Sequence, residues 1–300
     1  MRRLASISLV SAVVVGLGSP ASRPAPASAG GAVRAVSPAT ASRPYGLKVP
    51  EGYDGQHPTP LVVLLHGYTS NGSAQNAYFK LGPLADRKHF LLAYPDGTVD
   101  LFGNRFWNAT DACCDFFNSG VDDVGYIDAV IDEIAGRYNV DQARIYLVGH
   151  SNGAFMAHRF ACDHAGRIAA IVTLAGMQWK DAGRCPAASP VSVLHVHGRD
   201  DQTIHYEGGS TPKAAYPGAV ETVGAWAAKD GCTGSLTATG QRLDLDESVP
   251  GEETAVEHYP GCTGVDVELW TINGGSHVPA FNGHWAEAIW DFLAGHRKAG

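Results

Sequence analysis

Short apolar runs recur along the chain, and each one ends at a glycine, a proline or a polar residue. Runs of this length without polar alternation are typical of strands that are buried on both faces of a parallel sheet. The runs that we interpret as strands are residues 60–65, 90–94, 144–148, 168–174, 191–196 and 265–272.

Segments with helical periodicity lie between these runs. Apolar residues recur at helical spacing from Ile127 to Tyr138, and helices are also expected over residues 154–161, 219–229 and 285–294. The candidates for the N-terminal cap of the first of these helices are Ser119, Asp122 and Asp123. Strands that alternate with helices predict an α/β fold, with a mostly parallel central sheet and helices on both faces.

One strand-to-helix junction carries a candidate nucleophile. The sequence GHSNG at residues 149–153 follows the strand 144–148 and precedes an expected helix, which is the context required of a Gly-x-Ser-x-Gly elbow. In such a turn the serine hydroxyl projects above the sheet, and the helix N-terminus favours developing negative charge. We therefore interpret Ser151 as a nucleophile; a glycine-rich turn that merely contains serine is the alternative.

A serine hydroxyl needs a base, and the base needs an acid. Asp200 and Asp201 follow the strand 191–196, and His277 follows the strand 265–272. The order nucleophile, acid, histidine is that of hydrolases with this kind of elbow, and ligands bind beyond the carboxyl ends of parallel strands. We predict His277 as the base. The residues alone leave the choice between the two aspartates open.

An acyl-transfer site also needs two N–H donors for the oxyanion. One is expected from Asn152, the residue after the nucleophile, and the other from the loop after the first central strand. Tyr68 is our choice in that loop, with Thr69 as the alternative. An ordinary surface turn would also fit this stretch.

His195 and His197 alternate in a predicted strand and could form a His-x-His metal pair. Because no third ligand is evident, we expect them to pack in the core or behind the active site. No Cys-x-x-Cys spacing occurs either. We expect neither a metal nor another cofactor.

The beginning of the chain has the composition of an export signal. A basic start and an apolar run to about Leu17 precede a small-residue cleavage site at 27–29. The apolar run is shorter than the roughly 20 residues that span a bilayer. We expect a signal peptide over 1–29, a flexible lead over 30–43 and one catalytic domain over 44–300. The predicted protein is secreted and not bound to a membrane.

Charge and cysteine content limit the partners and the compartment. The formal net charge is −8 without a basic stripe, which argues against binding to nucleic acid. Six cysteines in an exported chain suggest disulfides. Their order favours Cys162–Cys185 and Cys232–Cys262, and leaves Cys113 and Cys114 either bonded to each other or paired elsewhere. We expect a monomer.

Several segments together resemble the secreted esterases of polyhydroxybutyrate depolymerase type, a family that also contains feruloyl and acetylxylan esterases. The segments are HGYTSNG, FWNATDACC, SGVDDVGYIDAVID, GHSNGAFMAHRFACDHAGRIAAI, HVHGRDDQTIHYEGG and GGSH. The resemblance implies the α/β-hydrolase fold and places the catalytic acid at Asp201. It also suggests that Trp107 lines the acyl pocket, although a core tryptophan beside Cys113 and Cys114 is an equal alternative.

The predicted function is that of a serine carboxylic-ester hydrolase acting through an acyl-enzyme. The resemblance implies a polyester, a hydroxycinnamoyl ester or an acyl-polysaccharide as the ester substrate. The alternatives are an acyltransferase on the same fold and a non-catalytic carbohydrate-binding protein.

Overall fold

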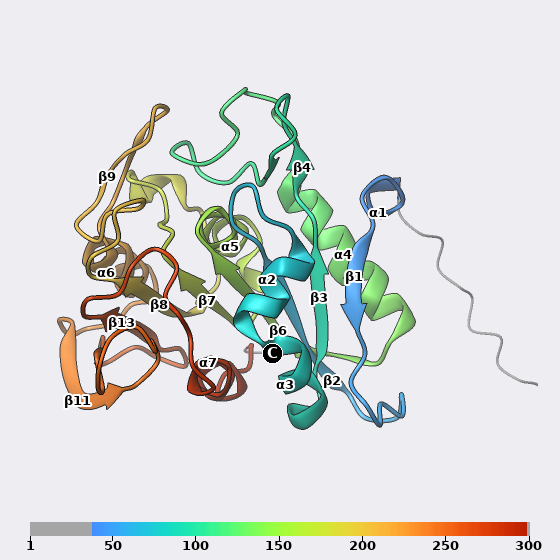
Figure 1. Cartoon of the computed structure of the whole chain (residues 1–300). Coiled ribbons are helices and arrows are strands. Elements are labelled where there is room, and N and C mark those ends of the chain that lie inside the picture. The colour runs from blue at the N-terminus through green and yellow to red at the C-terminus, as the bar shows by residue number, and fades with distance from the viewer. Residues whose placement is uncertain (1–37, 299–300) are drawn as a thin grey trace, which may run out of the picture. The chain divides into compact units, whose positions relative to one another are not determined.

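The structure, a computed structural model, describes residues 38–298; the signal peptide expected over 1–29 and residues 30–37 of the expected lead lie outside them. A nine-stranded sheet forms the centre of the domain (Figure 1). Its strands are β1 (Tyr45–Lys48), β2 (Thr59–Leu65), β3 (Leu91–Pro95), β6 (Val140–His150), β7 (Ala170–Leu174), β8 (Ser192–Gly198), β11 (Thr237–Leu243), β12 (Thr254–His258) and β13 (Val267–Ile272). Two small hairpins lie outside it, β4 (Thr98–Val99) with β5 (Arg105–Phe106) and β9 (Gly209–Ser210) with β10 (Ala215–Tyr216).

The strand order is β1-β3-β2-β6-β7-β8-β13-β12-β11. The six strands from β3 to β13 are mutually parallel, so all of their carboxyl ends meet at one edge of the sheet. Strand β1 joins one side in antiparallel orientation, and β12 and β11 join the other. The mostly parallel sheet predicted from the apolar runs is confirmed, and these six strands are the six predicted.

Helices cover both faces of the sheet. They are α1 (Pro38–Ser42), α2 (Gly72–Phe79), α3 (Leu81–Lys88), α4 (Asp123–Arg137), α5 (Asn152–Asp163), α6 (Ala219–Lys229) and α7 (His284–Ala294), with short 3-10 turns at Ala165–Arg167 and Ala182–Arg184. Side chains of β2 alternate between two hydrophobic cores, one shared with α4, α5 and α6 and the other with α3 and α7. No helix within residues 38–298 combines the length and the apolar character needed to cross a membrane.

Helix α4 begins where the sequence places a cap. The Asp122 side chain accepts a hydrogen bond from the Gly125 amide and so caps the helix N-terminus. From there the apolar positions face the core: Ile127, Val130, Ile131 and Ile134 are fully buried.

The last residues of the expected lead contact helix α4. Residues 38–42 form helix α1, and the Arg43 guanidinium bonds the Asp123 carboxylate at 2.6 Å. The same guanidinium lies 3.8 Å from the centre of the Tyr126 ring. An ion pair to a buried carboxylate and a cation–π contact hold this segment against α4, which composition alone does not reveal.

Three disulfides are present in the described residues. Cys162–Cys185 and Cys232–Cys262 are bonded as their order along the chain predicted. Cys113 and Cys114 are bonded to each other, the first of the two alternatives left open for them.

Strand β11 closes one side of the sheet and is polar and irregular. Its side chains are exposed, and its pairing with β12 shifts register between Ala238 and Arg242. The Arg242 guanidinium donates to the Glu252 carbonyl at 2.7 Å, which ties the shifted segment to the turn before β12. The apolar-run criterion could not find this strand because its two apolar residues, Ala238 and Leu243, are separated by polar residues and glycine.

Asp230 is a buried acid at the C-terminal cap of α6. Only 7 % of its surface is exposed. Burial raises the pKa of Asp230 to about 7, and the Val191 amide and the Lys229 ammonium offset this effect only in part. The folded state therefore holds a proton that the unfolded state releases between pH 4 and 7, so stability is lost as pH rises through this window.

We predict that Asp230→Asn removes this loss. One pKa unit corresponds to about 1.4 kcal/mol, and the wild type loses stability over the two pH units from pH 5 to its folded pKa of about 7. The stability difference between variant and wild type should therefore change by about 3 kcal/mol between pH 5 and pH 8, in favour of the variant. Urea unfolding at both pH values measures it. Asp291→Asn, at a side chain that is 74 % exposed, is the control. If Asp230→Asn differs from the wild type by the same free energy of unfolding at both pH values, the raised pKa of Asp230 is contradicted.

Candidate active site

The turn between β6 and α5 is a sharp elbow with Ser151 at its apex. Ser151 has φ 53°, a conformation that non-glycine residues seldom adopt, and its amide donates to the Leu174 carbonyl at 2.8 Å. A Cβ at Gly149 would lie 2.2 Å from the Gly153 carbonyl oxygen, and one at Gly153 would lie 2.2 Å from the Leu65 carbonyl oxygen. Both flanking glycines are therefore required by close backbone contacts.

Ser151, His277 and Asp201 lie in one line of hydrogen bonds. The Ser151 Oγ is 2.9 Å from His277 Nε2, and His277 Nδ1 is 2.7 Å from Asp201 Oδ2. Asp201 follows β8 and His277 follows the neighbouring strand β13, so adjacent strand ends bring them together. Asp200 is exposed, and its amide donates to the Gly275 carbonyl. The structure thus places Asp201, the aspartate indicated by the resemblance, against the histidine.

The Asp201 carboxylate is buried but well supplied with donors. Its Oδ1 accepts from the Thr203 amide at 2.7 Å and from the Ile204 amide at 2.9 Å. Burial acts to raise the pKa of Asp201, but hydrogen bonds from His197, His277 and the Ile204 amide outweigh it and hold the pKa below its usual range. The carboxylate is therefore ionised at neutral pH. It requires His277 to carry a hydrogen on Nδ1, which leaves Nε2 free to accept the Ser151 proton.

His150, the residue before Ser151, contacts the backbone of His277. Its Nε2 lies 3.0 Å from the His277 carbonyl oxygen, and the two rings are 5.2 Å apart. Burial and the neighbouring His277 lower the pKa of His150 to about 4, so it is neutral at pH 7. Its Nε2 hydrogen can donate to that carbonyl. Sequence reasoning missed this contact because the position is variable in the elbow pattern.

The two segments predicted to supply the oxyanion donors both lie next to Ser151. Asn152 begins α5, and the loop that contains Tyr68 passes beside the elbow, where a Cβ on Gly67 would be 3.4 Å from the Ser151 Cβ. The Thr69 amide donates to the Arg105 carbonyl at 2.9 Å and is not available to a ligand. This geometry favours Tyr68 over Thr69. The Tyr68 hydroxyl donates to Asp100 at 2.8 Å, which links the loop to the β4–β5 hairpin.

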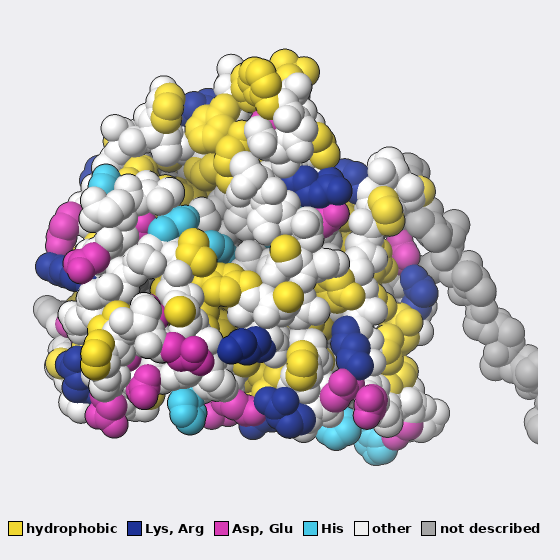
Figure 2. Space-filling model, viewed as in Figure 1, with side chains coloured by type: hydrophobic (Ala, Val, Ile, Leu, Met, Phe, Trp, Pro, Cys, Tyr) yellow, Lys and Arg dark blue, Asp and Glu magenta, His cyan; other side chains and the backbone are white. Residues whose placement is uncertain are grey.

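An apolar tip, formed by Val99, Leu101, Phe102 and Phe117, stands beside this loop. Their exposed fractions are 50 %, 85 %, 77 % and 44 %, and the Phe102 and Phe117 ring centres are 5.4 Å apart. Figure 2 shows hydrophobic side chains gathered at the top of the view, over the segment that follows β4.

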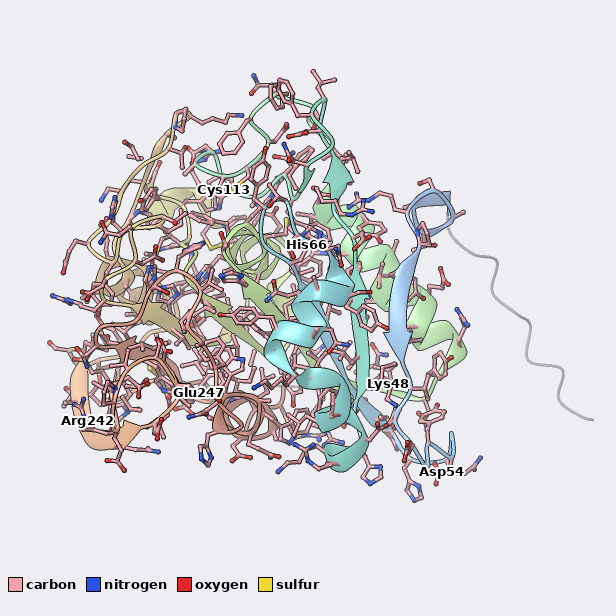
Figure 3. All side chains as sticks on the ribbon, in the orientation of Figure 1. Lys48, Asp54, His66, Cys113, Arg242 and Glu247 are labelled. Atoms are coloured by element: carbon pink, nitrogen blue, oxygen red, sulfur yellow. A yellow bond between two sulfur atoms is a disulfide. The ribbon has the colours of Figure 1, made fainter. Side chains whose placement is uncertain are left out.

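Trp107 lies in the core and not at an exposed wall. Its side chain is 0 % exposed, and its indole N–H donates to the His66 carbonyl at 3.0 Å. Its amide donates to Asn152 Oδ1 at 2.7 Å, and Asn152 Nδ2 donates back to its carbonyl at 3.0 Å. Figure 3 labels His66 and, in the loop above it, Cys113. Trp107 is therefore buried and hydrogen-bonded to Asn152, and its side chain has no exposed surface. A lining role in the acyl pocket stays a prediction.

His195 and His197 lie side by side on β8, fully buried. Their Nε2 and Nδ1 atoms are 3.2 Å apart, and His197 reaches Asp201. Among residues 38–298, no three His, Cys, Asp or Glu side chains are grouped so that they could hold a metal ion.

The sheet, the elbow and the strand-end loops together define an α/β-hydrolase fold. The acetyl xylan esterase from Aspergillus awamori superposes on the chain with a TM-score of 0.61 at 15 % identity, covering 83 % of this chain and 93 % of that one. The esterase PE8 superposes with a TM-score of 0.52 at 18 % identity, covering 84 % and 97 %.

The chain belongs to the family described as esterase PHB depolymerase, which matches residues 43–240. Feruloyl esterase B of Piromyces equi is 30 % identical over 82 % of the chain, and the putative esterase NocK of Nocardia uniformis subsp. tsuyamanensis is 29 % identical over 69 %. The matched segments span 44 % and 59 % of the lengths of these two relatives.

We predict that Asn152→Ala destabilises the fold, because it leaves the buried amide of Trp107 without a partner; the Trp107 carbonyl still accepts from the Ala109 and Cys114 amides. The expected loss is about 2 kcal/mol or more of the free energy of unfolding. Urea denaturation monitored by tryptophan fluorescence measures it. Gln241→Ala, at an exposed position on β11, is the matched control. An equal stability of the two variants would show that the reciprocal pair contributes little.

Proposed function

We propose that the chain is a secreted serine carboxylic-ester hydrolase. The observation that carries this proposal is the line Ser151–His277–Asp201, with hydrogen-bond distances of 2.9 Å and 2.7 Å at the carboxyl edge of the sheet. Membership of an esterase family supports the reaction class. The basic and apolar start of the chain and three disulfides support secretion.

In the proposed mechanism, the Ser151 hydroxyl attacks the ester carbonyl while His277 Nε2 takes its proton. The Asn152 and Tyr68 amides bind the oxyanion that forms, and Asp201 stabilises the imidazolium. His277 then protonates the departing alkoxide, which leaves an acyl group on Ser151. Water, deprotonated by the same histidine, attacks this acyl-enzyme and releases the acid.

Two classes of ester substrate fit the proposal. Feruloyl and acetyl xylan esterases among the similar proteins favour hydroxycinnamoyl or acetyl esters of polysaccharide. The family description and the apolar tip favour a polyester surface. The apolar tip has no charged side chain among its four members, and so it suits an apolar solid better than a hydrated polysaccharide.

The first experiment compares initial rates on methyl ferulate, p-nitrophenyl butyrate and a polyhydroxyalkanoate emulsion. Ser151→Ala should lower every measurable rate by about 10³-fold or more, because it removes the nucleophile. Ser210→Ala, at an exposed serine on β9, is the control and should retain activity. Unchanged rates in Ser151→Ala would overturn the serine mechanism, and the preferred ester identifies the substrate class.

The apolar tip gives a second prediction. Leu101→Ser combined with Phe102→Ser should lower the rate on the polyhydroxyalkanoate emulsion about tenfold or more and leave p-nitrophenyl butyrate hydrolysis unchanged, since burying a large apolar side chain is worth about 1.5–3 kcal/mol. Val220→Ser, at a 46 % exposed valine on α6, is the matched control. An unaltered ratio of the two rates would argue against adsorption through the tip.

A further inference from the structure

A chain of three buried side chains lies directly behind the proposed catalytic acid. The Thr173 Oγ1 on β7 is 2.9 Å from His195 Nδ1, and His195 Nε2 is 3.2 Å from His197 Nδ1. His197 Nε2 in turn is 3.2 Å from Asp201 Oδ2. All three side chains are 0 % exposed, so water does not compete for these contacts.

The surroundings of His197 determine where its hydrogen lies. Its Nε2 faces two acceptors only, the Asp201 carboxylate and the Ile204 carbonyl at 2.7 Å. His197 Nε2 must therefore carry a hydrogen, because without one its lone pair would face two other acceptor atoms. Its donor is thus directed at the loop that contains the acid.

The partner ring is held neutral. Burial, together with the neighbouring His197 and His158, keeps the pKa of His195 well below its usual value. Thr173 then donates to His195 and His195 donates to His197, while the hydrogen on His197 Nε2 is shared between the Ile204 carbonyl at 2.7 Å and the Asp201 carboxylate at 3.2 Å. Each ring is fixed at both nitrogens, so neither can rotate without losing a buried hydrogen bond.

The same ring also contacts the strand that leads to the base. His197 is paired in register with Thr271 on β13, and its ring meets that of Tyr206 edge-on at 5.7 Å. The Tyr206 hydroxyl is 2.8 Å from the Thr271 hydroxyl. His197 thus lies between the loop that carries Asp201 and the strand that precedes His277.

We propose that His197 is a positioning residue that fixes the Asp201 carboxylate toward His277, with His195 and Thr173 holding its ring. This inference rests on the proposed function, because it assigns a role in the same reaction. His197 does not touch the ester, so its contribution is expected in kcat and not in KM.

The test compares His197→Phe, which has no donor, with His197→Gln, whose amide nitrogen can replace Nε2. His158→Phe is the matched control: His158 is also 0 % exposed and accepts from the Trp226 indole at 3.0 Å, and its ring centre is 5.9 Å from that of His195. Circular dichroism and thermal melting establish that each variant is folded. Hydrolysis of p-nitrophenyl butyrate across pH gives kcat and KM.

We expect His197→Phe to lower kcat about 10-fold to 100-fold with little change in KM. This factor in kcat corresponds to the loss of one hydrogen bond to a charged group. The acidic limb of its pH profile should move to higher pH, because the carboxylate then directs more of its charge to the protonated His277. His197→Gln should recover most of kcat, and His158→Phe should retain the wild-type profile. Other titratable or charged groups near Asp201 and His277 also face this pH profile. They are His150, His195, Arg199, Asp200, His205 and Tyr206.

Other outcomes overturn the proposal. Wild-type kcat and profile in a folded His197→Phe would do so, as would an equal loss in His158→Phe. Should His197→Phe not fold, His197→Asn replaces it, since its shorter amide faces His195 and lacks a donor toward Asp201. The low-field proton resonance of the His277–Asp201 hydrogen bond gives a readout that does not need turnover. It should change in His197→Phe and His197→Asn, which lack the donor, and stay unchanged in His197→Gln. An inactive wild type would instead count against the proposed function.

Discussion

The close packing of helix α5 against strands β2 and β6 is the constraint on which the site depends. Glycine at positions 149 and 153 lets the helix backbone approach Leu65 within a distance that no side chain would allow. This approach bends the chain sharply at Ser151 and brings the first amide of α5 beside the loop after β2. Every other group at the site is placed relative to that turn, because the parallel strands deliver their loops to the same edge.

Buried polar groups at this edge are supported in layers. Asp201 carries negative charge inside the protein, and two backbone amides and two histidines share that charge. Asn152 is similarly buried, and its amide is matched by the backbone of Trp107. Because an unmatched polar group in such a place is costly, each pairing restricts the geometry of its neighbours.

Much of the fold could be predicted from local patterns. The apolar runs marked all six parallel strands, and helix α6 has the predicted bounds, because a run or a helical periodicity reports burial directly. Strand β6 is longer than its run, since it begins at Val140, which pairs with Thr59, and the polar residues Asp141 and Gln142 separate Val140 from the run. Strands β11 and β12 escaped prediction because they are largely exposed or antiparallel at the edge.

The site was predictable where motif and strand end coincide. Ser151 and His277 followed from the residues, whereas the choice of Asp201 over Asp200 came from the family resemblance. The contacts of His150, His197 and Trp107 join positions 41–127 residues apart or depend on the direction of a buried ring. Local sequence carries no information on such pairings, and only the folded chain supplies it.

The irregular edge at β11 has a consequence for the behaviour of the protein in concentrated solution. A flat, regular edge strand offers free N–H and C=O groups to the sheet of another molecule, which is a route to aggregation. The register shift between Ala238 and Arg242 makes this edge irregular. An irregular outer strand thus gives the sheet of another molecule a poorer template than a flat edge would.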